Sequence, residues 1–244
     1  KRAFMRAAHA YQGLSDWDKS LSAARAGLEI TPEDDPLHKQ FEDVIKQVSE
    51  QVKNIEKSTR TYLDSLNSCS SYFKQRGFSV GKLPFTWMGN WELMLRFDEE
   101  KNETIWPLAV AYDEVLQIDF VEGFSESTPL NELISMMLPG TIKEVESPGW
   151  DSLEHRYNTD TIFIYVKTYA CPYQWGRKAN LRASKNVIVD PSCCLKDIFM
   201  QNDYIIPGYP ILYIAVKDSV FAKKLNIERE IKPNGKTQKI EVIE

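Results

Sequence analysis

The chain has 244 residues, of which 43% are hydrophobic, and its formal net charge is −5. This composition suits a folded soluble protein, and no apolar stretch approaches the roughly 20 residues that a membrane-spanning helix needs. A sequence pI near 5.4 argues against a nucleic-acid-binding domain, which normally carries a basic excess.

Charge is distributed unevenly along the chain. Residues 98–160 contain 15 Asp and Glu against 3 Lys and Arg, whereas residues 161–244 contain 8 against 13. Two solvated faces that partly neutralise each other are one interpretation. The alternative is a dipolar surface that orients a partner protein.

The first 33 residues predict a helix hairpin. One face of the first helix carries apolar or small residues at the spacing i, i+3, i+4 and i+7: Phe4, Ala7, Ala8 and Tyr11. Ser15 or Asp16 is the expected cap of the second helix, which Pro32 ends because proline cannot continue a helix interior. Small residues on both helices, such as Ala8 and Ser20, would allow the two backbones to approach closely.

A long helix is expected over residues 34–77. Asp35 and Pro36 suit the N-cap and the first helical position. Apolar residues then recur in steps of three and four, and no Pro or Gly interrupts the pattern until Gly77, which suits the position just after a helix. The first half of this helix should cap the hairpin, and the second half should pack on the downstream domain or on a partner.

Residues 78–244 predict a small mixed α/β domain. Strands are expected over 91–97, 105–112, 161–166 and 211–216, and short helices over 129–138, 195–199 and 219–225. The first two strands flank a polar turn and would pair as a hairpin or meander. Continuous apolar strands with short helices imply a twisted sheet covered on at least one face. The fold class is therefore α+β: a helical hairpin and long capping helix, followed by this domain.

The sequence gives little support for catalysis. The histidines His9, His38 and His155 lie at no spacing that pairs them with a nucleophile or carboxylate, and there is no glycine-rich phosphate loop. The four cysteines lack the C-x-x-C spacing of a zinc or redox site. We therefore expect no enzyme activity, no cofactor and no metal, and reduced thiols typical of a cytosolic protein.

The hairpin resembles a single tetratricopeptide repeat. The resemblance rests on the positions of Phe4, Ala7-Ala8, Tyr11, Leu28 and Pro32. Ser20 and Ala24 replace the usual alanine and aromatic residue of the second helix. About three repeats are needed to bury a stacked core, so we expect that earlier repeats were removed on the amino-terminal side.

Downstream, the order of several short motifs forms a second pattern. They are Trp106-Pro107-Leu108, Asp119-Phe120-Val121, Pro148-Gly149-Trp150-Asp151, Val189-Asp190-Pro191, Pro210-Ile211-Leu212-Tyr213 and Ser219-Val220-Phe221. With the repeat before them, they resemble the carboxy-terminal wheel domain of the Cns-one and tetratricopeptide-repeat-four co-chaperones. The resemblance spans residues 1–225 and implies the domains 1–33, 34–77 and 78–244.

This resemblance implies a co-chaperone of heat-shock protein 90 that works in the cytoplasm and also in the nucleus. Its repeats would hold the acidic carboxy terminus of heat-shock protein 90, with heat-shock protein 70 as a further partner. The wheel domain would handle clients, with translation elongation factor 2 among them for the yeast member.

The resemblance also implies that Arg2 and Arg6 bind the terminal carboxylate of the chaperone peptide. They lie at i and i+4 on one helix face, and arginine offers a planar fork of charged donors. The family more often has lysine at the first of these positions, and two solvated arginines are the alternative. Because the rest of this site would lie upstream of Lys1, we expect the fragment alone to bind an acidic carboxy-terminal peptide weakly or not at all.

A basic segment, Gly176–Lys185, lies after the acidic residues 98–160. Trp175 and Arg177 lie in a polar loop here and are candidates for a client contact. The alternative function is an RNA- or ribonucleoprotein-binding scaffold, in which Arg177, Lys178, Arg182 and Lys185 would contact the nucleic acid beside Trp175.

Overall fold

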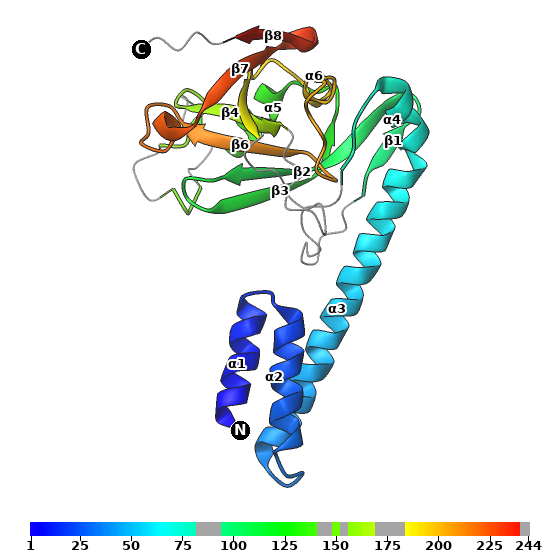
Figure 1. Cartoon of the computed structure of the whole chain (residues 1–244), viewed down its shortest axis with the longest axis vertical. Helices are drawn as coiled ribbons and strands as arrows, with labels where there is room; N and C mark the ends of the chain where they lie inside the picture. Colours follow the sequence, from blue (N-terminus) through cyan, green and yellow to red (C-terminus); the bar gives the residue numbers. More distant parts are fainter. Residues whose placement is uncertain (82–93, 141–147, 152–155, 169–183, 240–244) are drawn as a thin grey trace. The chain divides into compact units, whose positions relative to one another are not determined.

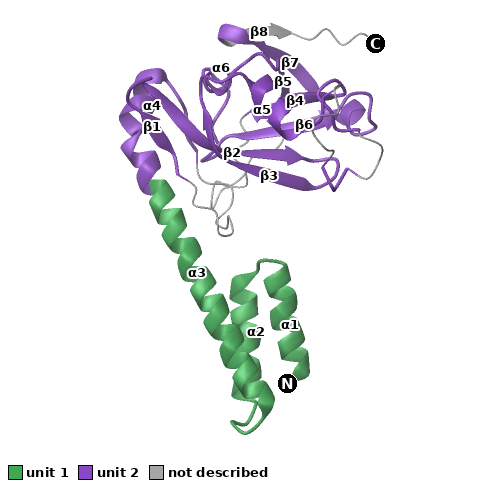
Figure 2. Cartoon of the chain, turned by 180° about the vertical axis from the view of Figure 1, so that it is seen from behind, with its two compact units in different colours: residues 1–63, 85–92 green, residues 64–84, 93–244 purple. Residues whose placement is uncertain are grey.

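The structure is a computed structural model, and it describes residues 1–81, 94–140, 148–151, 156–168 and 184–239. These residues form two compact units, one of residues 1–63 and one of residues 64–81 and 94–239 (Figure 2). In this described part, no helix has the length and apolar character needed to cross a membrane. The expected domain limits 1–33, 34–77 and 78–244 stay a prediction.

Three helices build the first unit: α1 (Arg2–Gly13), α2 (Trp17–Glu29) and α3 (Pro36–Ser68), of which α3 continues into the second unit (Figure 1). Their starts follow local signals in the sequence. The Asp16 carboxylate accepts the backbone N–H of Lys19 at 3.2 Å and caps α2. Asp35 accepts the N–H of Leu37 at 2.9 Å, and Pro36 is the first residue of α3.

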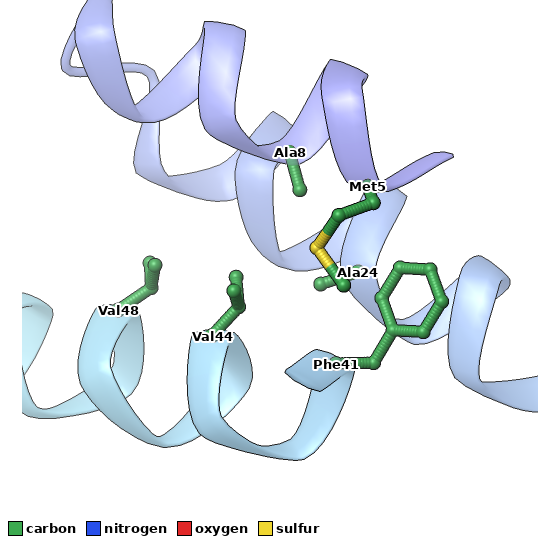
Figure 3. Close-up of a cluster of buried hydrophobic side chains, with 6 residues drawn as sticks. All are labelled: Met5, Ala8, Ala24, Phe41, Val44 and Val48. Carbon is green, nitrogen blue, oxygen red and sulfur yellow. The ribbon is translucent and has the colours of Figure 1, made fainter. Parts of the chain in front are cut away.

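The core of this unit is a small apolar cluster contributed by all three helices (Figure 3): Met5, Ala8, Ala24, Phe41, Val44 and Val48. Small residues let the helices approach. A Cβ added to Gly27 would lie 2.3 Å from the ring of Phe41, so Gly27 leaves the space that this ring occupies. The hydroxyl of Ser20 donates to the Ala8 carbonyl at 3.0 Å and is thereby satisfied in the interior.

The buried face of α1 differs from the one expected. Phe4 was expected on the core side, but 38% of it is exposed, whereas Met5 and Ala8 are buried. Ala8 is buried as expected, whereas Met5 replaces Phe4 in the core because it faces the cluster with α2 and α3. Phe4 lies at the border of this contact, where its Cβ would be 3.0 Å from a Cβ added to Gly27.

The long helix is not continuous to Gly77. It is interrupted at Cys69, and a separate helix α4 (Ser70–Arg76) follows in the second unit. The hydroxyl of Ser68 donates to the Ser65 carbonyl at 2.7 Å, which is a bond that competes with regular helix hydrogen bonding. Gly77 does end α4 in the left-handed conformation, with φ of 75°, as predicted.

The second unit contains one eight-stranded mixed sheet in the order β1-β2-β6-β4-β5-β7-β8, with β3 paired to β2. The strands are β1 (Arg96–Asp98), β2 (Glu103–Tyr112), β3 (Gln117–Ser125), β4 (Ile162–Thr168), β5 (Lys185–Val189), β6 (Ile211–Val216), β7 (Ile227–Lys232) and β8 (Lys236–Lys239). The pairs β2–β6 and β5–β7 are parallel and the others antiparallel. These observations confirm the α+β class.

The short helix α6 (Leu195–Phe199) packs on the sheet face that carries Trp106, and a second short helix, α5 (Leu130–Met137), is tied to the segment before α6 by the Leu130 N–H, which donates to the Cys193 carbonyl at 2.8 Å. The rings of Trp106 and Phe199 meet edge to face at 5.2 Å, and Phe73 of α4 stacks on Trp106 at 5.3 Å. This aromatic cluster is part of the core of the unit, whose central strands are buried on both faces.

The prediction of a helix over 219–225 is wrong. The chain forms only a 3-10 turn, η2 (Ala222–Lys224), and a second 3-10 turn, η3 (Pro233–Gly235), joins β7 to β8. The hydroxyl of Ser219 accepts the N–H of Ala222 at 2.9 Å and starts η2. Leu225 is already extended, because the chain must enter β7 two residues later.

Candidate functional site

The predicted carboxylate-binding residues lie on α1. Arg2 and Arg6 are both exposed, and their i, i+4 spacing places them one helical turn apart on the same face. No described residue forms an ion pair or hydrogen bond with either guanidinium group. The neighbouring Lys1 is different, because its ammonium group contacts Asp35 at 2.9 Å.

The electrostatics of this face favour an anion. The first turn of α1 contains no acidic residue, so the partial positive charge of the helix N-terminus adds to the charge of Arg2. His9 continues the row at i+7 from Arg2, and its Nδ1 lies 2.9 Å from the Gln12 side-chain oxygen. The hydrogen bond from Lys1, followed by that from the Leu37 amide, holds the pKa of Asp35 below its usual range. Asp35 therefore stays ionised and remains paired with Lys1. The two free guanidinium groups can hold a carboxylate by charge-assisted hydrogen bonds.

The other predicted contacts cannot be placed. Trp175 and Arg177 lie outside the described residues, as do Lys178 and Arg182 of the basic segment. Lys185, the last residue of that segment, is described in β5, where its ammonium group contacts Glu228 of β7. It is therefore paired within the sheet.

A feature that sequence reasoning missed is a buried polar cluster of Tyr72, Thr104, Trp106 and Glu126. Glu126 is only 1% exposed, and its carboxylate accepts the Tyr72 hydroxyl at 2.5 Å and the Thr104 hydroxyl on its other oxygen. Thr104 in turn accepts the Trp106 indole N–H at 2.7 Å. Burial, followed by the neighbouring Glu126, raises the pKa of Tyr72. The cluster joins α4 to β2 and to the segment after β3.

This cluster stabilises the fold and is not a binding site. Each side-chain donor in it has an acceptor, and the backbone carbonyl of Glu126 also accepts the N–H of Lys196 at 2.9 Å. A satisfied, buried network rigidifies its surroundings and leaves no group for a ligand. The tyrosine and glutamate are 54 residues apart, so no local sequence signal could have found them.

Other parts of the described structure do not form a second chemical site. A cavity of about 410 Å³ lies in the first unit, lined by Leu14, Ser15, Asp16, Trp17, Asp18, Val52, Ile55 and Glu56. These lining residues include no histidine or cysteine, and Asp16 is held by Lys19 at 2.6 Å. Among the residues that the structure describes, no three His, Cys, Asp or Glu side chains converge as metal ligands.

Comparisons with known proteins identify the second unit. Residues 96–206 match the family model of the Cns1/TTC4 Wheel domain. The chain is 22% identical over 237 residues to the tetratricopeptide repeat protein 4 homolog of Dictyostelium discoideum, covering 91% of the chain and 57% of the relative. It is 29% identical over 100 residues to tetratricopeptide repeat protein 4 of Mus musculus, covering 40% and 23%. The chain thus spans less than two thirds of either relative.

Solved structures give weaker likenesses. Hsp90 co-chaperone Cns1 of Saccharomyces cerevisiae aligns with a TM-score of 0.46 and 16% identity, over 88% of this chain and 66% of that one. Its C-domain aligns with a TM-score of 0.44 and 17% identity, over 67% and 87%. At these TM-scores the likenesses add nothing to the assignment.

The resemblance predicted from the ordered motifs is confirmed by the family match. Trp106, Phe120 and Val189 belong to motifs that fall inside residues 96–206, on strands of the one sheet. The chain therefore contains a segment, residues 96–206, that matches the Wheel domain of the Cns1/TTC4 family.

Proposed function

We propose that this protein is a co-chaperone adaptor of heat-shock protein 90, and that Arg2 and Arg6 contribute to holding the acidic carboxy terminus of that chaperone. The match of residues 96–206 to the Cns1/TTC4 Wheel domain supports the co-chaperone role, because Cns1 is described as an Hsp90 co-chaperone. The observation that carries the binding site is the pair of exposed guanidinium groups on α1, free of acidic partners among the described residues.

The physical basis is modest, which sets the expected affinity. Side chains at i and i+4 of a helix are about 5–6 Å apart at their Cβ atoms, a separation that lets both forks reach one carboxylate. Contacts between solvent-exposed charges each contribute about 0.2–1 kcal/mol. Two such contacts cannot give tight binding, so we expect this chain alone to bind the acidic peptide more weakly than micromolar.

The test compares charge variants in one binding experiment. Binding of a labelled acidic carboxy-terminal peptide would be followed by fluorescence anisotropy at chain concentrations well above micromolar, with Arg2→Ala/Arg6→Ala as the variant and Arg25→Ala, an exposed arginine of α2, as the matched control. We expect weaker binding for the double variant only. The same titration with the amidated peptide should show that any binding needs the free carboxylate. Equal binding by all three chains, or micromolar binding by the chain alone, contradicts the proposal.

The Wheel domain is the part that we assign to client handling, with translation elongation factor 2 as the client to test first and heat-shock protein 70 as a second chaperone. Trp175 and Arg177 remain the residues proposed for the client contact. Co-purification of the elongation factor should fall for Trp175→Ala/Arg177→Ala and stay unchanged for Arg2→Ala/Arg6→Ala. If co-purification fell for Arg2→Ala/Arg6→Ala and stayed unchanged for Trp175→Ala/Arg177→Ala, Trp175 and Arg177 would not be the client contact. The protein acts as an adaptor without catalysis, in the cytoplasm and the nucleus.

A further inference from the structure

The turn between β7 and β8 contains Asn234-Gly235, the one place in the sequence where glycine follows asparagine. Asn234 is exposed and has a left-handed backbone, with φ of 66° and ψ of 29°. We propose that Asn234 is a site of spontaneous covalent modification, at which the side chain loses ammonia and the residue becomes isoaspartate or aspartate. The proposal goes beyond the adaptor function and does not depend on it.

The reaction joins two groups that are neighbours in the chain. The backbone nitrogen of Gly235 attacks the side-chain amide carbon of Asn234. A C–N bond forms, that nitrogen gives up its proton, and the side-chain amide nitrogen leaves as ammonia. One water molecule then opens the resulting five-membered succinimide ring. Opening at one ring carbonyl gives aspartate, and opening at the other gives isoaspartate, in which the main chain runs through the former side chain. Water is the only co-reactant that these steps consume.

Backbone geometry determines how readily this ring closes. Closure brings the Gly235 nitrogen onto the same side of the Cα–C bond as Cβ, which requires ψ of Asn234 to be roughly −120°. The first central residue of a type II′ turn has this ψ together with a positive φ of about 60°. Asn234 already has the positive φ, so a rotation of about 150° in ψ separates the observed turn from the reactive one. A flip of one peptide plane is therefore the movement that the reaction needs.

The surroundings of the turn permit this flip. The paired residues of β7 and β8 end at Lys232 and Lys236, so the peptide between Asn234 and Gly235 lies outside the ladder. Gly235 has no Cβ and can adopt positive and negative φ with similar ease, so its backbone can follow the peptide plane. The missing side chain also leaves its nitrogen open to the amide carbon. Ring closure is thus compatible with the folded hairpin.

Asn102 provides a comparison within the same chain. It also has a left-handed backbone, with φ of 50°, in the turn between β1 and β2. The next residue, Glu103, is buried and pairs with Asp98 in the ladder. The carbonyl of Asn102 accepts the Tyr72 hydroxyl at 3.2 Å, so a flip of this peptide would break that bond. Asn102 should therefore stay unmodified, although its φ is similar to that of Asn234.

Isoaspartate at position 234 would weaken the pairing of β8. It adds one carbon atom to the main chain inside the three-residue turn Pro233–Gly235, which joins the paired residues Lys232 and Lys236. The register of a hairpin is fixed by the type and length of its turn. In the described sheet, β8 lies at the end of the strand order and pairs with β7 alone (Figure 1). The modification should thus loosen β8 and leave the central strands intact.

The experiment incubates the folded full chain in neutral buffer at body temperature and follows every asparagine by peptide mass spectrometry. Each conversion raises the mass of its peptide by about 1 Da, because oxygen replaces NH. Methyl transfer by an isoaspartyl methyltransferase detects the isoaspartate product. We expect Asn234 to convert first and Asn102 to remain unchanged. Earlier conversion of another asparagine, or conversion of Asn234 only after unfolding in urea, overturns the proposal.

Two variants test the mechanism and its effect on the fold. Gly235→Ala should slow the conversion by about tenfold or more, because its methyl group hinders the approach of the nitrogen. Asn234→Gly fits the left-handed turn and has no side chain that can react, so it is the control for β8. Hydrogen exchange of β8 should become at least about threefold faster in the incubated parent chain and stay constant in incubated Asn234→Gly. Equal conversion rates in Gly235→Ala and the parent contradict the mechanism. Unchanged exchange in the isoaspartate fraction contradicts the effect on β8.

Discussion

Replacing Thr104 by valine should test whether the buried polar cluster stabilises the second unit. The two side chains have the same shape, so the change removes one hydroxyl without opening a cavity. That hydroxyl donates to Glu126 and accepts from the Trp106 indole. Loss of a hydrogen bond to a charged group costs about 1.5–3 kcal/mol, and an unsatisfied buried N–H adds about 1–3 kcal/mol. We expect a total loss of about 3–5 kcal/mol in the free energy of unfolding.

The measurement must report on the second unit alone, because two units need not unfold together. Urea-dependent hydrogen exchange of peptides from β2 and β6 meets this requirement. At about 2–4 °C per kcal/mol for a unit of this size, thermal unfolding should move down by roughly 6–20 °C. Thr104→Ser keeps the hydroxyl and is the control, with an expected cost of about 1 kcal/mol for the lost methyl group. If valine cost less than about 1 kcal/mol, or no more than serine, the cluster would not be a stabilising lock.

Three further changes test the packing of both units. Gly27→Ala gains about 1 kcal/mol of helix propensity, but its Cβ would clash with the ring of Phe41. We therefore expect a net loss of about 1–2 kcal/mol in the free energy of unfolding, measured by thermal unfolding followed at 222 nm. Adding Phe41→Leu should restore part of this loss. Burial, followed by the carboxylates of Asp197 and Asp190, raises the pKa of Cys193 to about 12. Its native thiol should therefore react slowly with iodoacetamide at pH 8 and quickly in urea, and its contribution to stability should be lost as pH rises from about 8.5 towards 12. A chain truncated after Ile206 should lack the cooperative melting transition of the second unit, whereas one truncated after Lys239 should keep it.

Features set by neighbouring residues were predictable from the sequence. The caps at Asp16 and Asp35 and the end of α4 at Gly77 are local hydrogen-bonding or backbone events, so their signals lie within a few residues. The apolar runs at β2, β4 and β6 were predicted because these strands are buried on both faces. β7 was missed because its residues, Ile-Glu-Arg-Glu-Ile-Lys, show little apolar pattern near the sheet edge.

Features that depend on distant contacts could not be predicted in this way. The register of α1 depends on where α2 and α3 lie, so Phe4 was expected in the core although the buried residue is Met5. The buried polar cluster joins Tyr72 to Glu126, which lies 54 residues away in the sequence, so no local pattern indicates it. The row of Arg2 and Arg6 was readable from spacing alone, because two residues of one helix need no distant partner to share a face.

The limits of the folded Wheel unit follow from where its strands lie. The family match ends at Ile206, but β6 begins at Ile211 and pairs with both β2 and β4 in the middle of the sheet. At the other end, Phe73 precedes the matched residues and stacks on Trp106 in the core. A sheet whose centre comes from residues near 211–216 cannot close until that part of the chain has been added, because its neighbours otherwise expose buried edges. The unit that folds must therefore include residues on both sides of the matched segment.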